Sequence, residues 1–76
     1  MDEASLKEFF GRNLKEMRAE KGYTQAGLAE EIGISVEYIS KLERGLSSPS
    51  FETISRLSSG LEVHPYKLFD FRNLDN

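Results

Sequence analysis

Apolar residues recur at intervals of three and four along most of the chain, which is the pattern of amphipathic α-helices. The first apolar stripe consists of Leu6, Phe9, Phe10, Leu14 and Met17. Gly22 follows this stripe and predicts the end of the helix, because glycine adopts the left-handed backbone conformation that closes a helix at low steric cost.

Two short helices are predicted next, each bounded by a capping residue and a glycine. Thr24 is a suitable N-cap for the first and Ser35 for the second, because their hydroxyls accept hydrogen bonds from free backbone N–H groups. Gly33 and Gly45 predict where these two helices end. The residues expected to face the core are Leu28, Ala29 and Ile32 in the first helix, and Ile39 and Leu42 in the second.

A loop at residues 46–49 precedes a fourth predicted helix, for which Ser50 is the N-cap. The residues of this helix that are expected to face inward are Ile54, Leu57 and Leu61. Ser58 and Gly60 are poor helix formers, and glycine alone costs about 1 kcal/mol relative to alanine. We therefore expect this helix to fray at its end unless tertiary packing holds it.

A fifth, short helical turn is expected to start at His64, with Pro65 in the first helical position, where its missing N–H is not needed. Leu68 and Phe69 are expected to return to the core. The predicted organisation of the chain has three parts, which are a flexible N-terminus at residues 1–5, one all-α domain of five helices at residues 6–69, and a C-terminal tail at residues 70–76.

The composition is that of a small folded domain of 76 residues without cysteine. So small a domain buries a limited share of its surface, and its stability is marginal unless something adds to it. Disulfides are excluded, so dimerisation is the remaining candidate. Apolar residues never run longer than two in a row, so we expect no signal peptide or membrane span and a cytoplasmic protein.

The net charge of −3 argues against nucleic-acid binding, for which a basic domain is the usual electrostatic footprint. Local charge matters more for docking, because at physiological ionic strength the electrostatic attraction of a phosphate extends only about 8 to 10 Å. Residues 35–56 are locally neutral, with Lys41, Arg44 and Arg56 against Glu37, Glu43 and Glu52. If Glu43 is committed to Arg18 and Glu52 points into the first turn of the fourth helix, the side that would face DNA is mildly basic. This balance predicts weak nonspecific affinity for DNA and a requirement for two subunits.

The chain offers no recognisable catalytic constellation. It has a single histidine, His64, and its acidic residues lie mostly on predicted solvated helix faces. An enzyme would need a nucleophile with a base, or metal ligands, at workable spacing. We expect no enzymatic activity, no metal and no other cofactor, and no small-molecule effector is evident.

Two short helices joined by a glycine-containing turn, with one helix before and one after, form the layout of a DNA-binding helix-turn-helix. Residues 10–69 resemble the Cro and phage-repressor (XRE-like) family of DNA-binding domains, in the segments LKEMRAEKGYTQAGLAEEIGIS, VEYISKLERG and SPSFETISRLSSGLEV. The resemblance implies a compact five-helix bundle of the lambda-repressor-like type, with the helix-turn-helix in the second and third helices. Gly27 departs from the family, which often has a Glu there that completes a capping box.

The resemblance also implies that the start of the third helix enters the major groove, with base contacts from Val36, Glu37, Tyr38 and Lys41. Lys41 can donate to guanine, Glu37 can accept from cytosine, and Val36 can pack on a thymine methyl group. Glu37 is equally well explained as a carboxylate stabilised by the helix dipole. Tyr38 either stacks along the sugar–phosphate edge or covers the rim of the core.

Phosphate contacts are expected from hydroxyl, amide and guanidinium donors around the same helix. The predicted set is Thr24, Gln25, Ser40, Arg44, Ser47, Ser48 and Ser50. Gln25 lies in the first turn of the second helix, where free backbone N–H groups also suit a phosphate oxygen. The alternatives are a solvated side chain for Gln25, loop solvation for the serines, and helix capping for Ser50, which we prefer and which is compatible with a phosphate contact.

Arg18 and Glu43 have a structural role in the resemblance. In the family, an Arg at the end of the first helix pairs with the Glu before the turn that follows the recognition helix. Such a partly buried pair sets the orientation of the third helix relative to the first. The alternative is two unrelated surface charges.

These features predict a small transcription regulator that binds double-stranded DNA sequence-specifically, as a homodimer on a palindromic operator. The expected interface groups are Leu46, the fourth helix, Val63, Tyr66 and Phe71. The alternative function is a protein-interaction module on the same fold, such as an antitoxin or adaptor, which the acidic pI favours.

Overall fold

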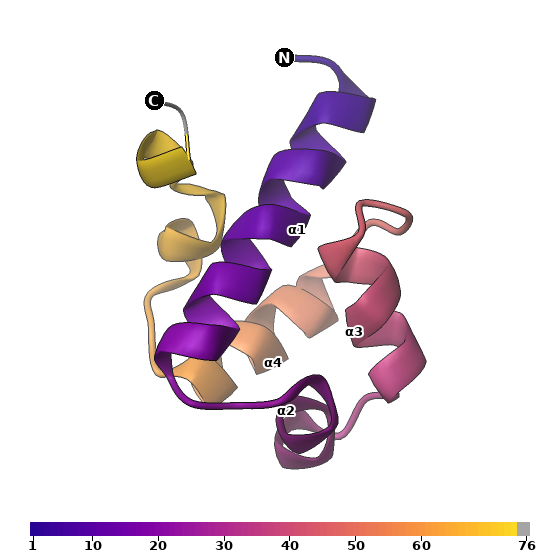
Figure 1. The fold of residues 1–76 in the computed structure, drawn as a ribbon, viewed down its shortest axis with the longest axis vertical. Coiled ribbons are helices and arrows are strands. Elements are labelled where there is room, and N and C mark those ends of the chain that lie inside the picture. Colours follow the sequence, from indigo (N-terminus) through magenta and orange to yellow (C-terminus); the bar gives the residue numbers. More distant parts are fainter. Residues whose placement is uncertain (75–76) are drawn as a thin grey trace.

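The computed structural model describes residues 1–74, whose first α-helix is the longest element (Figure 1). The elements are α1 (Glu3–Glu20), α2 (Gln25–Ile32), α3 (Val36–Glu43), α4 (Phe51–Leu61) and the 3-10 helices η1 (Pro65–Phe69) and η2 (Arg72–Leu74). The predicted all-α class is confirmed. The fifth predicted helix is a 3-10 helix, because a five-residue segment is too short to establish an α-helical ladder. No helix among the described residues is long and apolar enough to span a membrane.

Helical structure extends beyond both predicted boundaries of the domain. Asp2 caps α1 by accepting a hydrogen bond from the Ser5 backbone N–H at 2.8 Å, so the first residues of the chain are already helical. At the other end, the Phe71 ring stacks on the Phe9 ring of α1, with 5.7 Å between the ring centroids. The end of the predicted tail, residues 75–76, lies outside the described residues.

The core contains most of the apolar residues that were expected to face inward. Its buried members are Phe10, Leu14, Leu28, Ala29, Ile32, Ile39, Leu42, Leu57, Leu61 and Leu68. The prediction is wrong for Leu6 and Phe69, whose side chains are 41% and 40% exposed. Phe69 covers the edge of the core instead, with its ring centroid 5.2 Å from that of Phe10.

Two glycines let pairs of helices approach closely. A Cβ atom at Gly11 would overlap the carbonyl oxygen of Leu42, so α1 and α3 pack backbone against backbone. A Cβ atom at Gly60 would overlap the side chain of Ile32, which brings α4 against α2. The weak helix former Gly60 is therefore a packing residue.

α4 continues as a helix to Leu61, and its last turn is packed against the rest of the protein. Ser58 is buried, and its hydroxyl donates to the carbonyl oxygen of Ser55 at 3.0 Å. The helix closes after Leu61 through Glu62, which adopts the left-handed conformation with a φ of 58°. The Val63 N–H then donates to the carbonyl oxygen of Ser58 at 3.0 Å, which satisfies one of the free carbonyl groups at the helix end.

Candidate nucleic-acid interface

The turn between α2 and α3 is held from both sides. Gly33 closes α2 with a φ of 76°, and Ser35 caps α3 by accepting a hydrogen bond from the Tyr38 N–H at 3.1 Å. From α4, the Arg56 guanidinium donates to the carbonyl oxygens of Ile32 and Gly33, both at 3.1 Å. This contact was not predicted, and it places a positive charge at the negative end of the α2 dipole.

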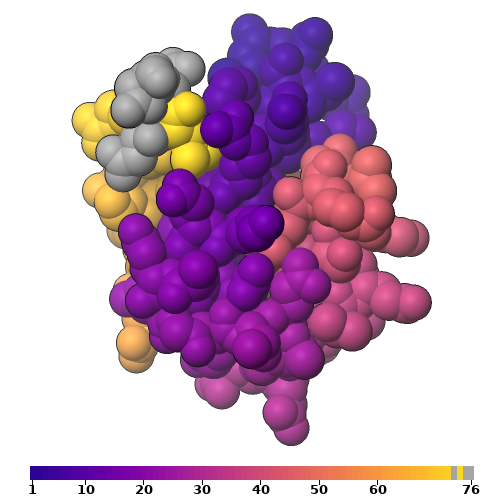
Figure 2. Space-filling model, in the orientation of Figure 1, coloured from indigo at the N-terminus to yellow at the C-terminus, as the bar shows by residue number. Residues whose placement is uncertain are grey.

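α3 buries one side completely and leaves the opposite side open. Ile39 and Leu42 are fully buried, as the sequence pattern predicted. The exposed side carries Val36, Glu37, Lys41 and Arg44, which we call the reading face. α3 and the loop that follows it lie at the right-hand edge of the molecule in Figure 1, and side chains of this part of the chain stand out there in Figure 2.

Tyr38 differs from the other residues assigned to base contacts, because it lies against the protein. Its side chain is half-buried and packs on the core. Its hydroxyl donates to the Ser48 carbonyl oxygen at 3.2 Å and accepts from the Thr53 hydroxyl at 3.4 Å. Of the two readings left open by the sequence, the structure favours the one in which Tyr38 covers the rim of the core.

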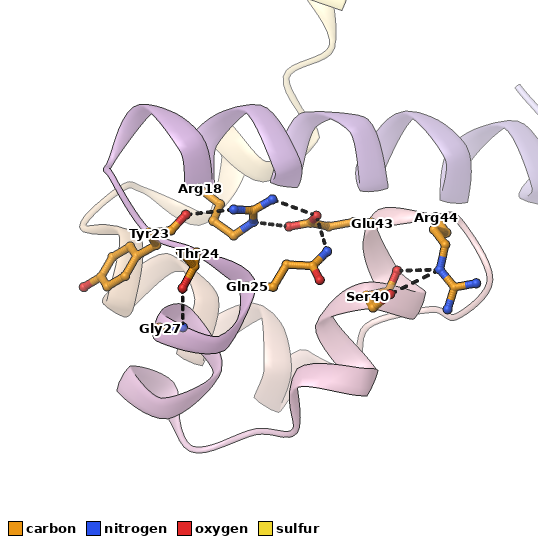
Figure 3. Close-up of polar contacts among 8 residues, drawn as sticks. All are labelled: Arg18, Tyr23, Thr24, Gln25, Gly27, Ser40, Glu43 and Arg44. Atoms are coloured by element: carbon orange, nitrogen blue, oxygen red, sulfur yellow. Dashed lines mark hydrogen bonds and ion pairs between the residues drawn. The ribbon is translucent and has the colours of Figure 1, made fainter.

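Arg18 and Glu43 form the ion pair that the resemblance implied (Figure 3). Arg18 Nε donates to Glu43 Oε2 at 2.6 Å and Arg18 Nη2 donates to Glu43 Oε1 at 3.2 Å, while Nη1 donates to the Tyr23 carbonyl oxygen at 2.7 Å. The Glu43 side chain is only 3% exposed. A carboxylate buried to this degree needs a partner, and the Arg18 pair supplies it.

Gln25 joins this network, which sequence reasoning missed. Its amide Nε2 donates to Glu43 Oε1 at 2.8 Å, so the first turn of α2 is tied to the last turn of α3 (Figure 3). The side chain is half-buried, not a freely solvated glutamine. No local signal could have identified this contact, because the two residues are 18 positions apart and the pairing depends on how the helices pack.

The hydroxyl residues assigned to phosphate contacts fall into three groups, which are capping residues, one residue within α3 and loop residues. Thr24 Oγ1 accepts from the Gly27 N–H at 2.9 Å and Ser50 Oγ accepts from the Thr53 N–H at 3.1 Å, so both are helix caps. On α3, Ser40 Oγ accepts from Arg44 Nε at 3.2 Å, which holds the guanidinium beside the helix (Figure 3). The remaining members, Ser47 and Ser48, lie in the loop between α3 and α4.

The structure gives this side of the molecule the mildly basic balance expected from the sequence if Glu43 pairs with Arg18. Glu43 is buried and paired with Arg18, and Glu52 pairs with Arg56 at 2.9 Å. The reading face therefore retains Glu37 against the two bases Lys41 and Arg44. A mildly basic surface is compatible with a polyanionic ligand despite the acidic chain as a whole.

Comparison with known proteins matches this architecture to one family. The family model described as "Helix-turn-helix" matches residues 14–68. The control protein C.BamHI of Bacillus amyloliquefaciens is 33% identical over 73 residues, which cover 95% of this chain and 90% of that protein. The transcriptional regulator SinR of Bacillus subtilis is 38% identical over 61 residues, or 79% of this chain and 55% of SinR. The chain thus spans about half the length of SinR.

A solved structure shows the same fold. The restriction-modification controller protein C.AhdI from Aeromonas hydrophila superposes with a TM-score of 0.81 at 35% sequence identity, over 83% of this chain and 96% of that one. The matched segment of the family model contains the buried Arg18–Glu43 pair, the turn at Gly33 and the whole reading face. The resemblance noted in the sequence is confirmed, and the chain belongs to the helix-turn-helix family of XRE-like regulators.

Proposed function

We propose that this protein is a transcription regulator that binds double-stranded DNA sequence-specifically, with α3 in the major groove. The observation that carries the proposal is the division of α3 into a fully buried side and an exposed reading face. Ile39 and Leu42 anchor the helix, so the rest of the molecule leaves the reading face open to a ligand. The family and its regulator and controller relatives support the same function.

Base recognition is assigned to the exposed residues Val36, Glu37 and Lys41. The Lys41 ammonium suits guanine O6 or N7, the Glu37 carboxylate suits cytosine N4, and the Val36 methyl groups suit the methyl group of thymine. Each good base contact contributes about 1 to 3 kcal/mol of discrimination. Tyr38 leaves this set, because its hydroxyl is bonded to the loop and to α4.

Phosphate contacts are assigned to the groups that flank α3. Arg44 is exposed at the end of the helix, and Ser47 and Ser48 follow it in the loop. On the other side, the free N–H groups at the start of α2 suit a phosphate oxygen, beside Thr24 and Gln25. Because the Gln25 amide also bonds Glu43, its contact with phosphate would be made by a side chain already held in place.

A second copy of the chain is the partner proposed for the apolar surface of α4 and η1. Phe51 is 90% exposed and Tyr66 is 60% exposed. They line a groove of about 470 Å³ with Ile54, Ser55, Ser58, Pro65 and Phe69, none of which is charged. A homodimer would cover this surface and supply two reading faces for two half-sites of a palindromic operator, which offsets the weak affinity of one mildly basic face.

Of the predicted interface residues, Val63 and Phe71 are partly buried against the core of their own chain, whereas Leu46 is exposed outside the groove.

The groove also favours the second candidate function, in which the protein is an antitoxin or adaptor that binds a different protein partner. The two functions differ in the role of the reading face, which only the DNA-binding function requires.

Two measurements test the proposed function. Selection of duplexes from a random pool, followed by fluorescence anisotropy at low salt, should yield a preferred sequence that binds more tightly than a scrambled duplex. Light scattering should show a dimer at micromolar concentration. Absence of binding to any duplex at tens of micromolar would favour the protein-interaction function, and a monomer at high concentration would contradict the homodimer. A cytoplasmic location is part of the proposal, since the regulators SinR and C.BamHI come from bacteria, whose DNA lies in the cytoplasm.

A further inference from the structure

We propose that Tyr38 is a positioning residue for DNA binding, whose hydroxyl anchors the loop at residues 46–50 so that the loop presents its donors to the phosphate backbone. This inference rests on the proposed DNA-binding function. It assigns to Tyr38 a role different from the base contact that its place in α3 suggests. The role follows from where the hydroxyl lies and from what else holds the loop.

The Tyr38 hydroxyl connects three parts of the molecule. It belongs to α3, donates to the carbonyl oxygen of Ser48 in the loop at 3.2 Å, and accepts from the hydroxyl of Thr53 in α4 at 3.4 Å. Thr53 Oγ1 in turn accepts from the hydroxyl of Ser50, the N-cap of α4, at 3.0 Å. One phenol group therefore links the recognition helix to the loop and to the first turn of α4.

The middle of this loop has few other hydrogen bonds, although Ser48 and Pro49 also line a small hollow with Leu6 and Phe10 of α1. On its first side, the Leu46 N–H donates to the Lys41 carbonyl oxygen at 2.9 Å, and on its last side Ser50 begins α4. Within residues 1–74, the bond from Tyr38 is the hydrogen bond that reaches residues 47–49 from the rest of the protein. Ordering a loop on binding costs conformational entropy, so a loop anchored before binding loses less affinity than a free one.

A variant at Thr53 affects the Tyr38 hydroxyl without removing a group that could itself contact DNA. Thr53 is buried, with 6% of its surface exposed, and so it is shielded from DNA. Replacing Thr53 with valine removes the hydroxyl bonded to Tyr38 and keeps the shape of the side chain. A change in DNA affinity in that variant would have to pass through the Tyr38 hydroxyl or the cap of α4.

The test compares Tyr38→Phe, Thr53→Val and the double variant with wild type, by anisotropy on the selected duplex and on a scrambled duplex. We expect Tyr38→Phe to weaken binding about three- to ten-fold on both duplexes, the scale of one hydrogen bond, because phosphate contacts carry no sequence information. Thr53→Val should give a smaller loss in the same direction, and the double variant should lose less than the product of the two. Tyr23→Phe is the matched control, since the Tyr23 hydroxyl makes no hydrogen bond within residues 1–74.

Two results would overturn the proposal. A loss on the selected duplex alone, or a loss for Tyr38→Phe without any change in the backbone order of Ser47 and Ser48, would indicate direct contact of the phenol with DNA. Unchanged binding in both single variants would leave Tyr38 a structural residue only. Each comparison is made well below the melting temperature of the variant, so that loss of folded protein does not imitate loss of affinity.

Backbone dynamics of the free protein separate failure of the anchor from failure of the proposed function. The ¹⁵N relaxation order parameters of the Ser47 and Ser48 amides should be lower in Tyr38→Phe than in wild type, and unchanged in Tyr23→Phe. Unchanged order parameters in Tyr38→Phe would overturn the anchor itself. Absence of wild-type binding to any duplex would instead overturn DNA binding, and the positioning role with it.

Discussion

α3 and α4 are both capped by serine and both bury leucine in the same core, yet the surfaces that they expose to solvent differ in chemistry. The outward side of α3 carries Glu37, Lys41 and Arg44, whereas α4 begins with the exposed Phe51. Their attachments differ as well. α3 is held to α1 through the buried Arg18–Glu43 pair, and α4 is held to α2 by close packing at Gly60. Similar inner faces thus leave outer faces of different chemistry, which the proposed function assigns to DNA for α3 and to a second copy of the chain for α4.

The largest effect is expected from breaking the attachment of α3. Arg18→Ala leaves the Glu43 carboxylate buried without its ionic partner, which costs about 3 kcal/mol or more. For a domain of this size the melting temperature should fall by about 12 °C or more, measured by circular dichroism. Lys15→Ala removes an exposed charge from the same helix and should change stability by less than about 0.5 kcal/mol. Equal melting temperatures for the two variants would show that the pair does not hold α3.

The outer face of α4 is tested by Phe51→Ser. Burial of a phenylalanine side chain at an interface is worth about 1.5 to 3 kcal/mol, so the dimer dissociation constant should rise about ten-fold or more, as measured by sedimentation equilibrium. Stability of the monomer should hardly change, because Phe51 is 90% exposed. Leu46→Ser removes an exposed apolar side chain outside the groove and should leave the dimer intact. If Leu46→Ser weakens the dimer and Phe51→Ser does not, the interface lies at the loop after α3 and not at the groove.

The outer face of α3 is tested by Lys41→Ala. Loss of one base contact should weaken binding to the selected duplex about ten-fold and binding to a scrambled duplex less, so that discrimination falls. Lys67→Ala removes the same charge from η1 and controls for the change in net charge. If the two variants lose affinity equally on both duplexes, Lys41 acts through charge alone.

The smallest effect is expected at the attachment of α4. Gly60→Ala forces a methyl group against Ile32, which costs about 1 to 3 kcal/mol, while the gain in helix propensity returns about 1 kcal/mol. The free energy of unfolding, measured in urea, should therefore decrease by about 1 kcal/mol. Ser59→Ala, at an exposed position in the same turn, should leave it unchanged or slightly higher. A stabilised Gly60→Ala variant would show that α4 can shift away from α2.

Much of the fold was predictable because its signals are local. Thr24, Ser35 and Ser50 cap the helices expected from the sequence, and each accepts a hydrogen bond from an N–H group three residues further along. The buried residues of α2 and α3 follow the helical period in the same way. At the ends of the chain this reasoning fell short, because the Asp2 cap and the packing of Phe71 on Phe9 were overlooked.

The site was predictable in outline only. Resemblance supplied the Arg18–Glu43 pair and the exposed start of α3, but the partners of Gln25, Tyr38 and Arg56 come from residues 10 to 24 positions away. Another contact of this kind joins buried Asn13 to the carbonyl oxygens of Lys67 and Leu68, more than 50 positions further along. Such bonds depend on how the helices pack, which the helical period does not encode.

The sequence by itself determined the helices between Thr24 and Leu61 and the side of each that turns inward, because caps, glycines and apolar spacing act within a few residues. Only the tertiary structure decided which polar groups form hydrogen bonds within the protein and which stay available to a ligand. Gln25, Arg56 and the Tyr38 hydroxyl are engaged by neighbouring elements, while Glu37 and Lys41 stay exposed. The physical reason is that a polar group removed from water needs a hydrogen-bond partner nearby, and the packing of the helices determines which groups lie close enough to bond.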